Sequence, residues 1–415
     1  MMKQSILYLW IAVAVLASST PASAQTPVRL ETGAGYASDV YYSFTEGEVA
    51  REPRTNWDLA FEIAVPSAVR INSGAGTAAW LYSTNPAQDW ETVDTTGKLT
   101  DAKALHNDPT LWQVGALNRP ATDDPNDLGW GVYNLVTHVI GGNRLFILKS
   151  VAGTFYKLWI RERANRRYQI RVARLDGSQP RELTVNTGDY PEKLFAYLNL
   201  ETGEVLDREP DRRRWQLLFT QYTDLVAAGP GQRLPYGVSG VLTHPNLITA
   251  QRDSIDVATF RDTTNLPWNP DINEIGYDWK RFDLASNQFA VIPNRAYFVQ
   301  NAPNSVWKIV FTAFGGSATG VYEFTQQQLG NVSRSKRFDA PAVQVWPNPA
   351  TAGQGVRFSQ PVASVVWHDA QGRELHRSTS SGLGTAVPQL PSGLYLLNLE
   401  LPDGGRESIR LIVQP

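Results

Sequence analysis

A segment that occurs twice constrains this 415-residue chain more than any other feature of its sequence. Residues 41–63 contain an aromatic-rich run, a Gly-Glu-Val turn, a polar segment and the run 57–61, which Trp opens and Phe closes. Residues 195–222 follow the same order and reach a matching run at 215–219. Both copies alternate apolar and polar residues around a glycine turn, which predicts a β-hairpin with one buried face.

A second pair of landmarks has the same spacing in both copies. Arg144 follows an Asn and precedes Lys157 by thirteen positions, and Arg295 follows an Asn and precedes Lys308 by thirteen positions. Two matched landmarks in the same order indicate a duplicated unit rather than a chance match.

The strand pattern predicts an all-β protein. Short β-branched and aromatic runs alternate with Gly, Pro, Asn and Asp turns, which is typical of antiparallel sheets and sandwiches. We expect one β-rich unit over residues 27–176 and a second in tandem over 192–329. An exposed linker over 330–342 would then lead to a small Ig-like β-sandwich over 343–415.

The N-terminus and the charge predict an exported protein. Lys3, the apolar stretch 6–17 and the small residues 22–24 have the pattern of a signal peptide over residues 1–24. The apolar stretch is too short to span a bilayer, and no later segment reaches that length, so no transmembrane segment is expected after cleavage. A net charge of −2 argues against a nucleic-acid partner.

The lack of sulfur restricts the ligand chemistry. The chain has no cysteine, and both methionines, Met1 and Met2, would leave with the signal peptide. The mature chain would then offer no disulfide and no thiolate or thioether ligand, so its cores depend on apolar burial.

The C-terminal domain resembles the type A C-terminal sorting domain of the type IX secretion system of Bacteroidetes. The matching residues are Trp346, Pro347, Asn348, Pro349 and Ala350, then Asp369 and Gly372 to Leu375, then Leu390 to Leu396 with Gly393 and Tyr395, and a terminal strand over 409–413. The resemblance implies export across a Gram-negative outer membrane by the type IX machinery. It also implies that a sortase-like protease removes residues 343–415, leaving the cargo released or attached to surface lipopolysaccharide. An ordinary Ig-like appendage is the alternative interpretation.

The duplicated units resemble the HmuY family of haem-binding proteins. The matching runs are 56–61, 70–76, 146–149 and 155–159 in the first unit and 297–299, 307–311 and 322–324 in the second. The resemblance implies a β-rich fold and haem as the ligand. The axial haem ligands of the family have no matching motif positions in this chain.

Two histidines are the candidates for binding haem iron, because a chain without sulfur would use His or Tyr as axial ligands. His106 lies in the irregular insert 83–128, which could fold over a ligand. His138 would share one face with Val136 and Ile140 if this segment is extended. We predict His106 and His138 as the cofactor-binding pair. The alternative is a solvated loop histidine and a half-buried strand histidine.

Other interpretations stay open. The acidic residues 123–127 offer oxygen ligands for calcium, although their spacing matches no known calcium loop, and a solvated turn is the alternative. Tryptophans in or beside irregular segments would stack on a sugar if exposed, although burial is the more common situation. These are Trp80, Trp90, Trp112, Trp130 and Trp268. We expect structural roles for His368 and His376. His244 precedes a proline in an extended loop and has no second histidine in its unit, so we do not expect it to bind a ligand.

No catalytic motif supports an enzyme. The chain lacks a nucleophile elbow, an HExxH helix, a P-loop and a dinucleotide-binding fingerprint, although a pair of glycosidase carboxylates needs no sequence proximity. We therefore expect a non-catalytic binding protein that is secreted or attached to the outer cell surface. Haem is its implied ligand, and surface saccharides or adhesion are the alternative.

Overall fold

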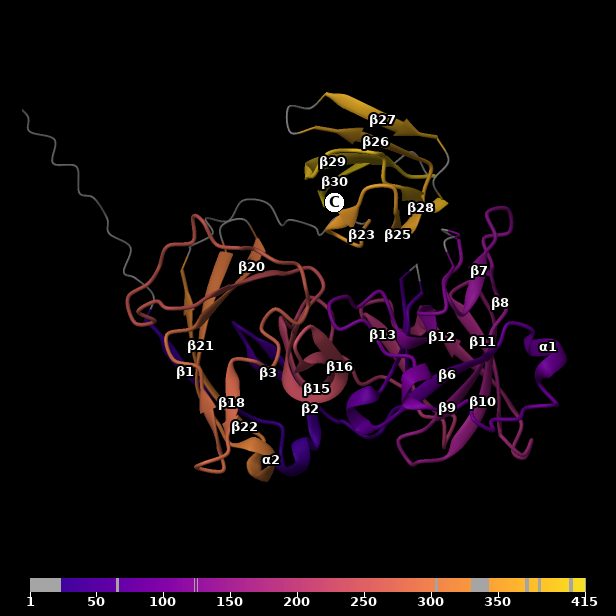
Figure 1. The fold of residues 1–415 in the computed structure, drawn as a ribbon, viewed down its shortest axis with the longest axis horizontal. Helices are drawn as coiled ribbons and strands as arrows, with labels where there is room; N and C mark the ends of the chain where they lie inside the picture. The colour runs from indigo at the N-terminus through magenta and orange to yellow at the C-terminus, as the bar shows by residue number, and fades with distance from the viewer. Residues whose placement is uncertain are drawn as a thin grey trace, which may run out of the picture.

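The computed structural model describes residues 24–64, 67–122, 124, 126–302, 305–329, 343–369, 373–379, 382–402 and 406–414. Nearly all of the predicted signal peptide, the predicted linker over 330–342 and Gly372 lie outside these ranges. Within them the protein is built from almost entirely antiparallel sheets with a few very short helices, which confirms the all-β prediction (Figure 1). No helix in these ranges is long and apolar enough to cross a membrane.

Two lobes form the body of the molecule. We call residues 59–206 lobe A. Its strands are β4 (Leu59–Glu62), β5 (Val69–Ile71), β6 (Ala78–Ser83), β7 (Gly131–Tyr133), β8 (Ile140–Gly142), β9 (Leu145–Lys149), β10 (Phe155–Ala164), β11 (Arg167–Arg174), β12 (Arg181–Asn186), β13 (Phe195–Leu198) and β14 (Val205–Leu206). Most of them form one sheet with the strand order β12-β11-β10-β8-β7, in which β9 also pairs with β10 and β6 pairs with β9. The others form a second sheet with the order β14-β13-β4-β5.

Lobe B combines residues 26–53 with residues 217–328. Its strands are β1 (Thr26–Glu31), β2 (Ser38–Ser43), β3 (Gly47–Pro53), β15 (Leu217–Gly229), β16 (Gln232–Thr243), β17 (Ile248–Arg252), β18 (Lys280–Asp283), β19 (Gln288–Val291), β20 (Ala296–Ala302), β21 (Ser305–Phe314) and β22 (Val321–Gln328). Its sheets are ordered β1-β22-β21-β20-β17, β16-β15-β2-β3 and β18-β19. The helices of both lobes are α1 (Pro86–Asp89), α2 (Gly316–Thr319) and the 3-10 turns η1 (Ala34–Tyr36), η2 (Ser73–Ala75), η3 (Asp101–Lys103), η4 (Ala116–Asn118) and η5 (Thr187–Asp189).

The two sequence copies exchange their opening strands. The hairpin of the first copy, β2–β3, pairs through β2 with β15, and the hairpin of the second copy, β13–β14, pairs through β13 with β4. Strand β1 likewise completes lobe B by pairing with β22. The register is the same in both places, because Tyr41 lies opposite Leu218 and the equivalent Tyr197 lies opposite Ala60. The lobes are therefore interlocked, and strand pairing crosses between the two sequence copies.

Aromatic side chains fill the seam where the exchanged hairpins meet. The hydroxyls of Tyr41 and Tyr197 are 3.4 Å apart, and both rings belong to a buried cluster that includes Trp112 and Trp215. Burial raises the pKa of Tyr197 well above its usual value and acts in the same direction on Tyr41, so both phenols stay neutral at the seam.

A buried ion pair also crosses the seam. Arg208, which follows β14, donates to the Asp39 carboxylate on β2 at 2.8 Å, and both side chains are almost fully buried. Burial alone would lower the pKa of Arg208, but the attraction of Asp39 more than offsets it. A buried charge pair of this kind is costly to break because one partner would stay charged and unpaired.

The landmark lysines hold the irregular inserts against the sheets. Lys157 on β10 donates to the carbonyl oxygen of Trp90 at 2.6 Å, and Lys308 on β21 donates to that of Phe260 at 3.0 Å. Both lysines are buried. Their common spacing in the sequence thus reflects one structural task performed twice.

The C-terminal domain is a separate two-sheet sandwich. Its strands are β23 (Val345–Trp346), β24 (Ala350–Thr351), β25 (Gly355–Val362), β26 (Ser364–His368), β27 (Glu374–Ser378), β28 (Gly382–Ala386), β29 (Gly393–Glu400) and β30 (Arg406–Gln414). The sheets are ordered β23-β25-β28 and β24-β30-β29-β26-β27, and one apolar core joins them.

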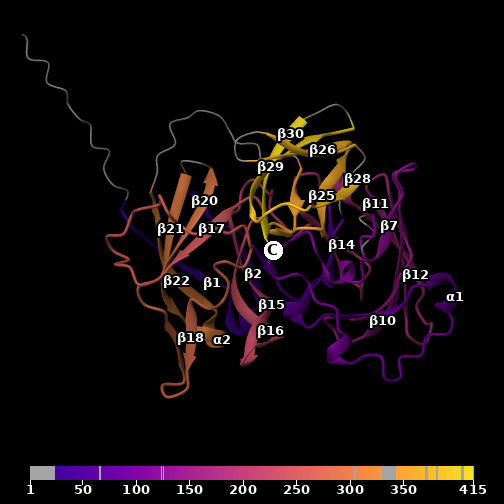
Figure 2. The ribbon, with the colours of Figure 1, turned by 45° about the horizontal axis from the view of Figure 1, so that its top comes forward.

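The C-terminal domain rests on the body near the junction of the lobes (Figures 1 and 2). Arg357 donates to the carbonyl oxygen of Asp127 in lobe A at 2.6 Å, and Gln344 donates to Asn246 in lobe B at 2.9 Å. Leu383 is fully buried and belongs to the apolar core of lobe A. The domain therefore contacts both lobes.

Candidate functional site

His106 lies in the irregular insert of lobe A and is half-buried. Burial lowers its pKa, and the positive charge of nearby Arg119 lowers it further. The imidazole is therefore neutral near pH 7, which is the state that binds a metal. Arg119 also donates to the main-chain oxygen of His106 at 3.1 Å, which fixes the local backbone.

His138 lies in the turn between β7 and β8, not on an extended strand. Its backbone is left-handed, with φ of 57°, and neighbouring Val136 is 86% exposed whereas Ile140 is buried. The expectation that the three residues share one strand face is wrong, because the chain reverses direction at this turn. The Nδ1 atom of His138 is 2.7 Å from the hydroxyl of Tyr133.

This contact leaves His138 suited to act as a single ligand. If Nδ1 carries the proton and donates to Tyr133, the lone pair of Nε2 is available to a metal, an arrangement common around metal-binding histidines. Exposed Leu135 and Val136 lie in the same turn and offer apolar surface. His106 and His138 come from different segments, so their pairing on one haem stays a prediction.

His244 has a structural role that the sequence did not predict. It is buried against Trp215, with ring centroids 4.8 Å apart, and its Nδ1 accepts a hydrogen bond from the backbone of Asn246. Burial lowers its pKa to about 3, so it stays neutral under ordinary conditions.

The tryptophans do not form a stacking surface. Trp80, Trp90, Trp112 and Trp130 are buried, and Trp268 is half-buried against a small apolar cluster of lobe B. The expectation that most of them are buried is confirmed, because the inserts fold over the sheets and use these rings as their own core. A sugar-binding site formed by the rings of the four buried tryptophans, Trp80, Trp90, Trp112 and Trp130, is therefore excluded.

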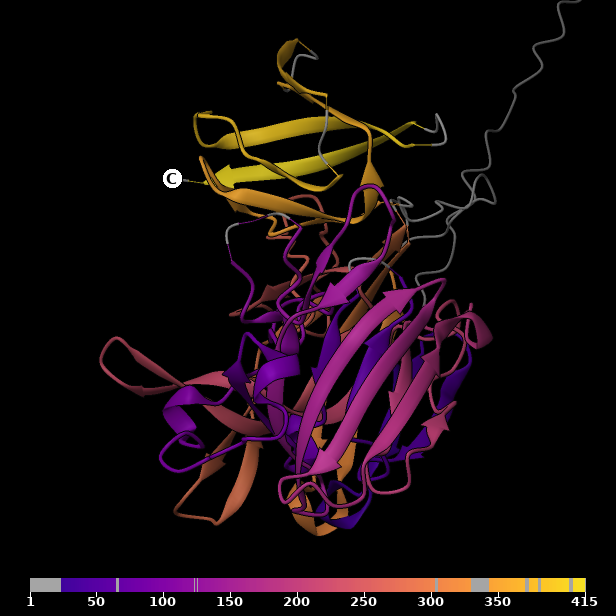
Figure 3. The same ribbon diagram turned by 90° about the vertical axis from the view of Figure 1, so that its right-hand side faces the viewer.

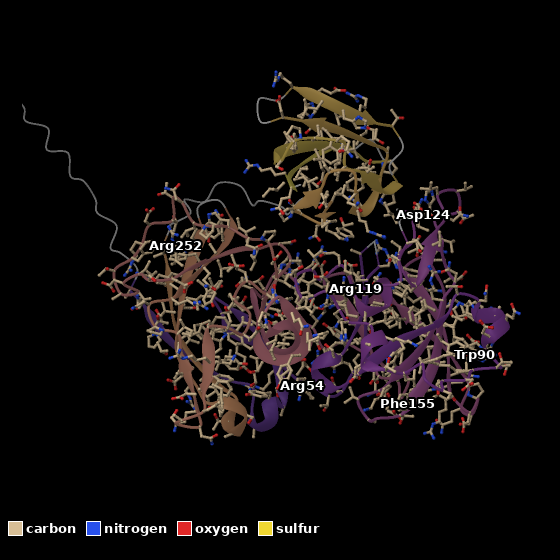
Figure 4. The ribbon with its side chains drawn as sticks, viewed as in Figure 1. Arg54, Trp90, Arg119, Asp124, Phe155 and Arg252 are labelled. Atoms are coloured by element: carbon tan, nitrogen blue, oxygen red, sulfur yellow. The ribbon has the colours of Figure 1, made fainter. Side chains whose placement is uncertain are left out.

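The acidic segment is a structural turn in its described part. Asp127 forms a buried ion pair with Arg144 at 2.9 Å and accepts hydrogen bonds from the backbone of Thr122 and Gly129. Figure 4 shows Asp124 and Arg119 on the side of lobe A that faces the C-terminal domain. Among the described residues, no three His, Asp or Glu side chains are arranged to hold a metal ion.

An open cavity of about 670 Å³ lies in lobe B, beside the second Asn-Arg landmark. It is lined by the loop that follows β17 and by the loop between β19 and β20, with Asp253, Asp256 and Asn294 among its polar residues. The Nε atom of Arg295 is 2.6 Å from Asp253, which orients this carboxylate at the rim. Sequence reasoning treated the landmark as a mark of duplication and missed the cavity.

The landmark residues differ in exposure between the two copies. Arg144 in lobe A pairs with Asp127 in a fully buried setting, whereas the partners of Arg295, Asp253 and Asp278, are half-exposed or more. The same two residues therefore close the surface in lobe A and line an open depression in lobe B.

The predicted sorting residues fasten the C-terminal domain. The Asn348 side chain donates to the carbonyl oxygen of Arg410 at 3.0 Å and accepts from the backbone of Ile412 at 2.8 Å, which ties the motif to β30. Asp369 accepts from the backbone and side chain of Arg373 at 2.9 and 2.7 Å. The hydroxyl of Tyr395 donates to the carbonyl oxygen of Pro391 at 2.6 Å.

The remaining sorting residues lie at the ends of strands. Pro347 and Pro349 flank Asn348 in the connection from β23 to β24, and Gly393 opens β29. These residues therefore have structural roles in the sandwich.

Comparisons with known proteins give little guidance. No known protein family matches the sequence, and no curated protein is significantly similar. Among solved structures, dimeric latent PorU from Porphyromonas gingivalis matches 67% of this chain and 32% of that chain, with 9% identity and a TM-score of 0.14. A similarity this low carries no argument about fold or function.

Proposed function

We propose that this chain is an exported, non-catalytic binding protein that acts outside the cell. The observation that carries the proposal is the C-terminal sandwich, in which Asn348, Asp369 and Tyr395 each make a hydrogen bond that fixes a turn or a terminal strand. These are the residues through which the domain resembles a type IX sorting signal. The domain has its own core, as a removable signal requires.

Export is tested in a Bacteroidetes host with an active type IX system and in a matched host that lacks it. We expect the full chain outside the first host and in the periplasm of the second. Asn348→Ala should reduce export because it releases β30, whereas Arg377→Ala, which removes only an exposed ion pair with Glu374, should not. Equal export from both hosts would refute the type IX route.

Haem is the ligand that we propose from the resemblance, and His138 is its best supported contact. The support is the 2.7 Å contact between Nδ1 and Tyr133 together with the exposed apolar turn. Haem would supply the iron that this imidazole ligates, and the chain would supply the ligand and the apolar surface.

A haemin titration of the chain without its signal peptide tests this assignment. We expect a saturable, shifted Soret band that His138→Ala abolishes and that Tyr133→Phe weakens. His376→Ala, an exposed histidine of the C-terminal domain, is the matched control and should bind as the parent does. A loss in His106→Ala as well would establish the pair, and a flat titration of the parent would exclude haem.

Saccharide binding is the second candidate, and the polar cavity of lobe B favours it. Carboxylate, amide and guanidinium groups converge there beside Ile255 and Ile292. Asn294 has a left-handed backbone, with φ of 58°, so Asn294→Gly removes the amide without strain. Asn165→Gly, at φ of 49° in lobe A, is the matched control. A glycan array signal lost only in Asn294→Gly would support the saccharide function.

A further inference from the structure

The hairpin of β15 and β16 extends well beyond what the fold of lobe B needs. These strands have 13 and 12 residues, whereas the equivalent β4 and β5 of lobe A have 4 and 3. Pairing continues out to Gly229 opposite Gln232, far from the buried part of both strands. Because lobe A folds without such an extension, the added length serves something other than the core.

The outer part of this hairpin is largely apolar, and its nearest carboxylate, that of Asp224 opposite Tyr236, is buried. Residues 225–237 contain a single charge, that of Arg233. Leu225 is 41% exposed, Leu234 58% and Tyr236 66%. Exposed large apolar side chains gathered in one place mark an interaction surface rather than an ordinary protein surface.

The edge of β16 is not built to receive another strand. Val241 exchanges hydrogen bonds with Gly276, so its backbone faces outward, and by alternation the backbone of Pro235 faces outward too. Proline has no N–H to donate and is a common protection of sheet edges. The side chains of the hairpin, not its backbone, therefore make the contact.

A second hairpin, β18–β19, begins next to the first. Lys280 at the start of β18 donates to the carbonyl oxygen of Ser239 on β16 at 2.6 Å. Towards its tip, Phe282 is 46% exposed and Leu284 is 87% exposed, but the exposed carboxylate of Asp283 lies between them. This tip is therefore not suited to enter an apolar phase. Figure 2 shows both hairpins extending downwards, whereas Figure 3 shows the β15–β16 hairpin pointing to the left and the β18–β19 hairpin pointing downwards, so their tips face different directions.

We propose that lobe B docks on a lipid surface by inserting the tip of the β15–β16 hairpin. Residues 227–231 at the first tip are uncharged, and the Arg233 guanidinium bends back from the tip to donate to the carbonyl oxygen of Leu225 at 2.6 Å. Tyr236 lies further behind the tip. An apolar tip with a tyrosine and a backward-turned arginine behind it matches the layering of a bilayer interface. A protein partner would more often be met by both charge signs around the apolar centre.

The test uses vesicles of phosphatidylcholine alone and of phosphatidylcholine with phosphatidylglycerol. Because the chain has no cysteine, Leu234→Cys gives a single site for an environment-sensitive fluorophore. We expect its emission to shift to the blue with vesicles and to be quenched by nitroxide-labelled lipid. Val136→Cys, on the exposed turn of lobe A, is the control and should show neither change.

Loss of function is measured by flotation of the full chain with the same vesicles. The double substitution Leu234→Asp with Tyr236→Asp should lower the partition coefficient by at least about tenfold, since both side chains would leave the bilayer. Val136→Asp should change it by less than about twofold. Binding that requires phosphatidylglycerol and survives the double substitution would overturn insertion in favour of a purely electrostatic contact. An unchanged Leu234→Cys spectrum would overturn lipid docking and leave a protein as the partner of the hairpin.

Discussion

The exchange of opening strands predicts that a substitution in one sequence copy destabilises the lobe built mainly from the other. Leu198 belongs to the second copy but is fully buried in the core of lobe A, opposite Leu59. The equivalent Tyr42 belongs to the first copy but is buried in the core of lobe B, opposite Leu217. Truncation of either residue therefore reports on where its strand is inserted.

The expected size follows from the burial. Leu198→Ala removes a fully buried side chain from a close-packed core and should cost about 3 kcal/mol of lobe A stability. Tyr42→Ala should cost about 4 kcal/mol in lobe B, because it also removes the hydrogen bond from the Tyr42 hydroxyl to Gln326. A loss of about 3 kcal/mol corresponds to roughly a hundredfold faster exchange of amides that are freed only by opening of the lobe.

Hydrogen exchange followed by mass spectrometry separates the lobes. Leu198→Ala should accelerate exchange in β4, β9, β10 and β11, and Tyr42→Ala should accelerate it in β20, β21 and β22. Faster exchange confined to β15–β22 in Leu198→Ala would show that the hairpins pair within their own copies, and the exchange of strands would be refuted.

Three further predictions concern buried polar groups. Arg208→Met should lower the free energy of unfolding by about 3–5 kcal/mol because it leaves the Asp39 carboxylate buried without its cation. Adding Asp39→Asn should recover more than half of this loss. A double-mutant cycle in urea with a coupling energy below about 1 kcal/mol would contradict the prediction. The pKa of His244 is about 3 when folded and near 6.5 when unfolded. As the pH falls, the unfolded chain takes up a proton at this histidine before the folded chain does, so the free energy of unfolding decreases below about pH 6.5, by about 2 kcal/mol at about pH 5. His244→Phe should remove this slope from the pH dependence of the urea midpoint. An unchanged slope would count against the assignment. Lys308→Met should accelerate limited proteolysis near residues 257–260, and Lys157→Met should do so near Trp90, since each lysine holds that backbone by hydrogen bonds; cleavage at unchanged rates would show that the inserts are held by other contacts.

The candidate site was predictable only in part. From the sequence, His138 would share a strand face with its neighbours if the segment were extended, but the left-handed turn that exposes it depends on how β7 and β8 pair. The tryptophans of the inserts could be named, but their burial required knowing which sheet each insert covers. The cavity beside Arg295 had no signal of its own, because the same Asn-Arg pair lines a closed surface in lobe A.

The sequence by itself determined the local structure. Alternation of apolar and polar residues around glycine turns was enough for the all-β class, and the spacing of Trp57, Arg144 and Lys157 with their counterparts was enough for the duplication. These features follow from backbone geometry and side-chain polarity over a few residues, so they can be read without knowing the fold.

Only the tertiary structure decided which strands meet. The hairpin of each copy has one apolar face and one free edge, and β4 and β15 offer the same register to either hairpin. The alternation of apolar and polar residues shows that one face of a strand must be buried, but it does not show which strand or sheet covers that face. That choice depends on contacts between residues distant in the sequence, among them the tyrosine pair of the seam and the Asp39–Arg208 ion pair.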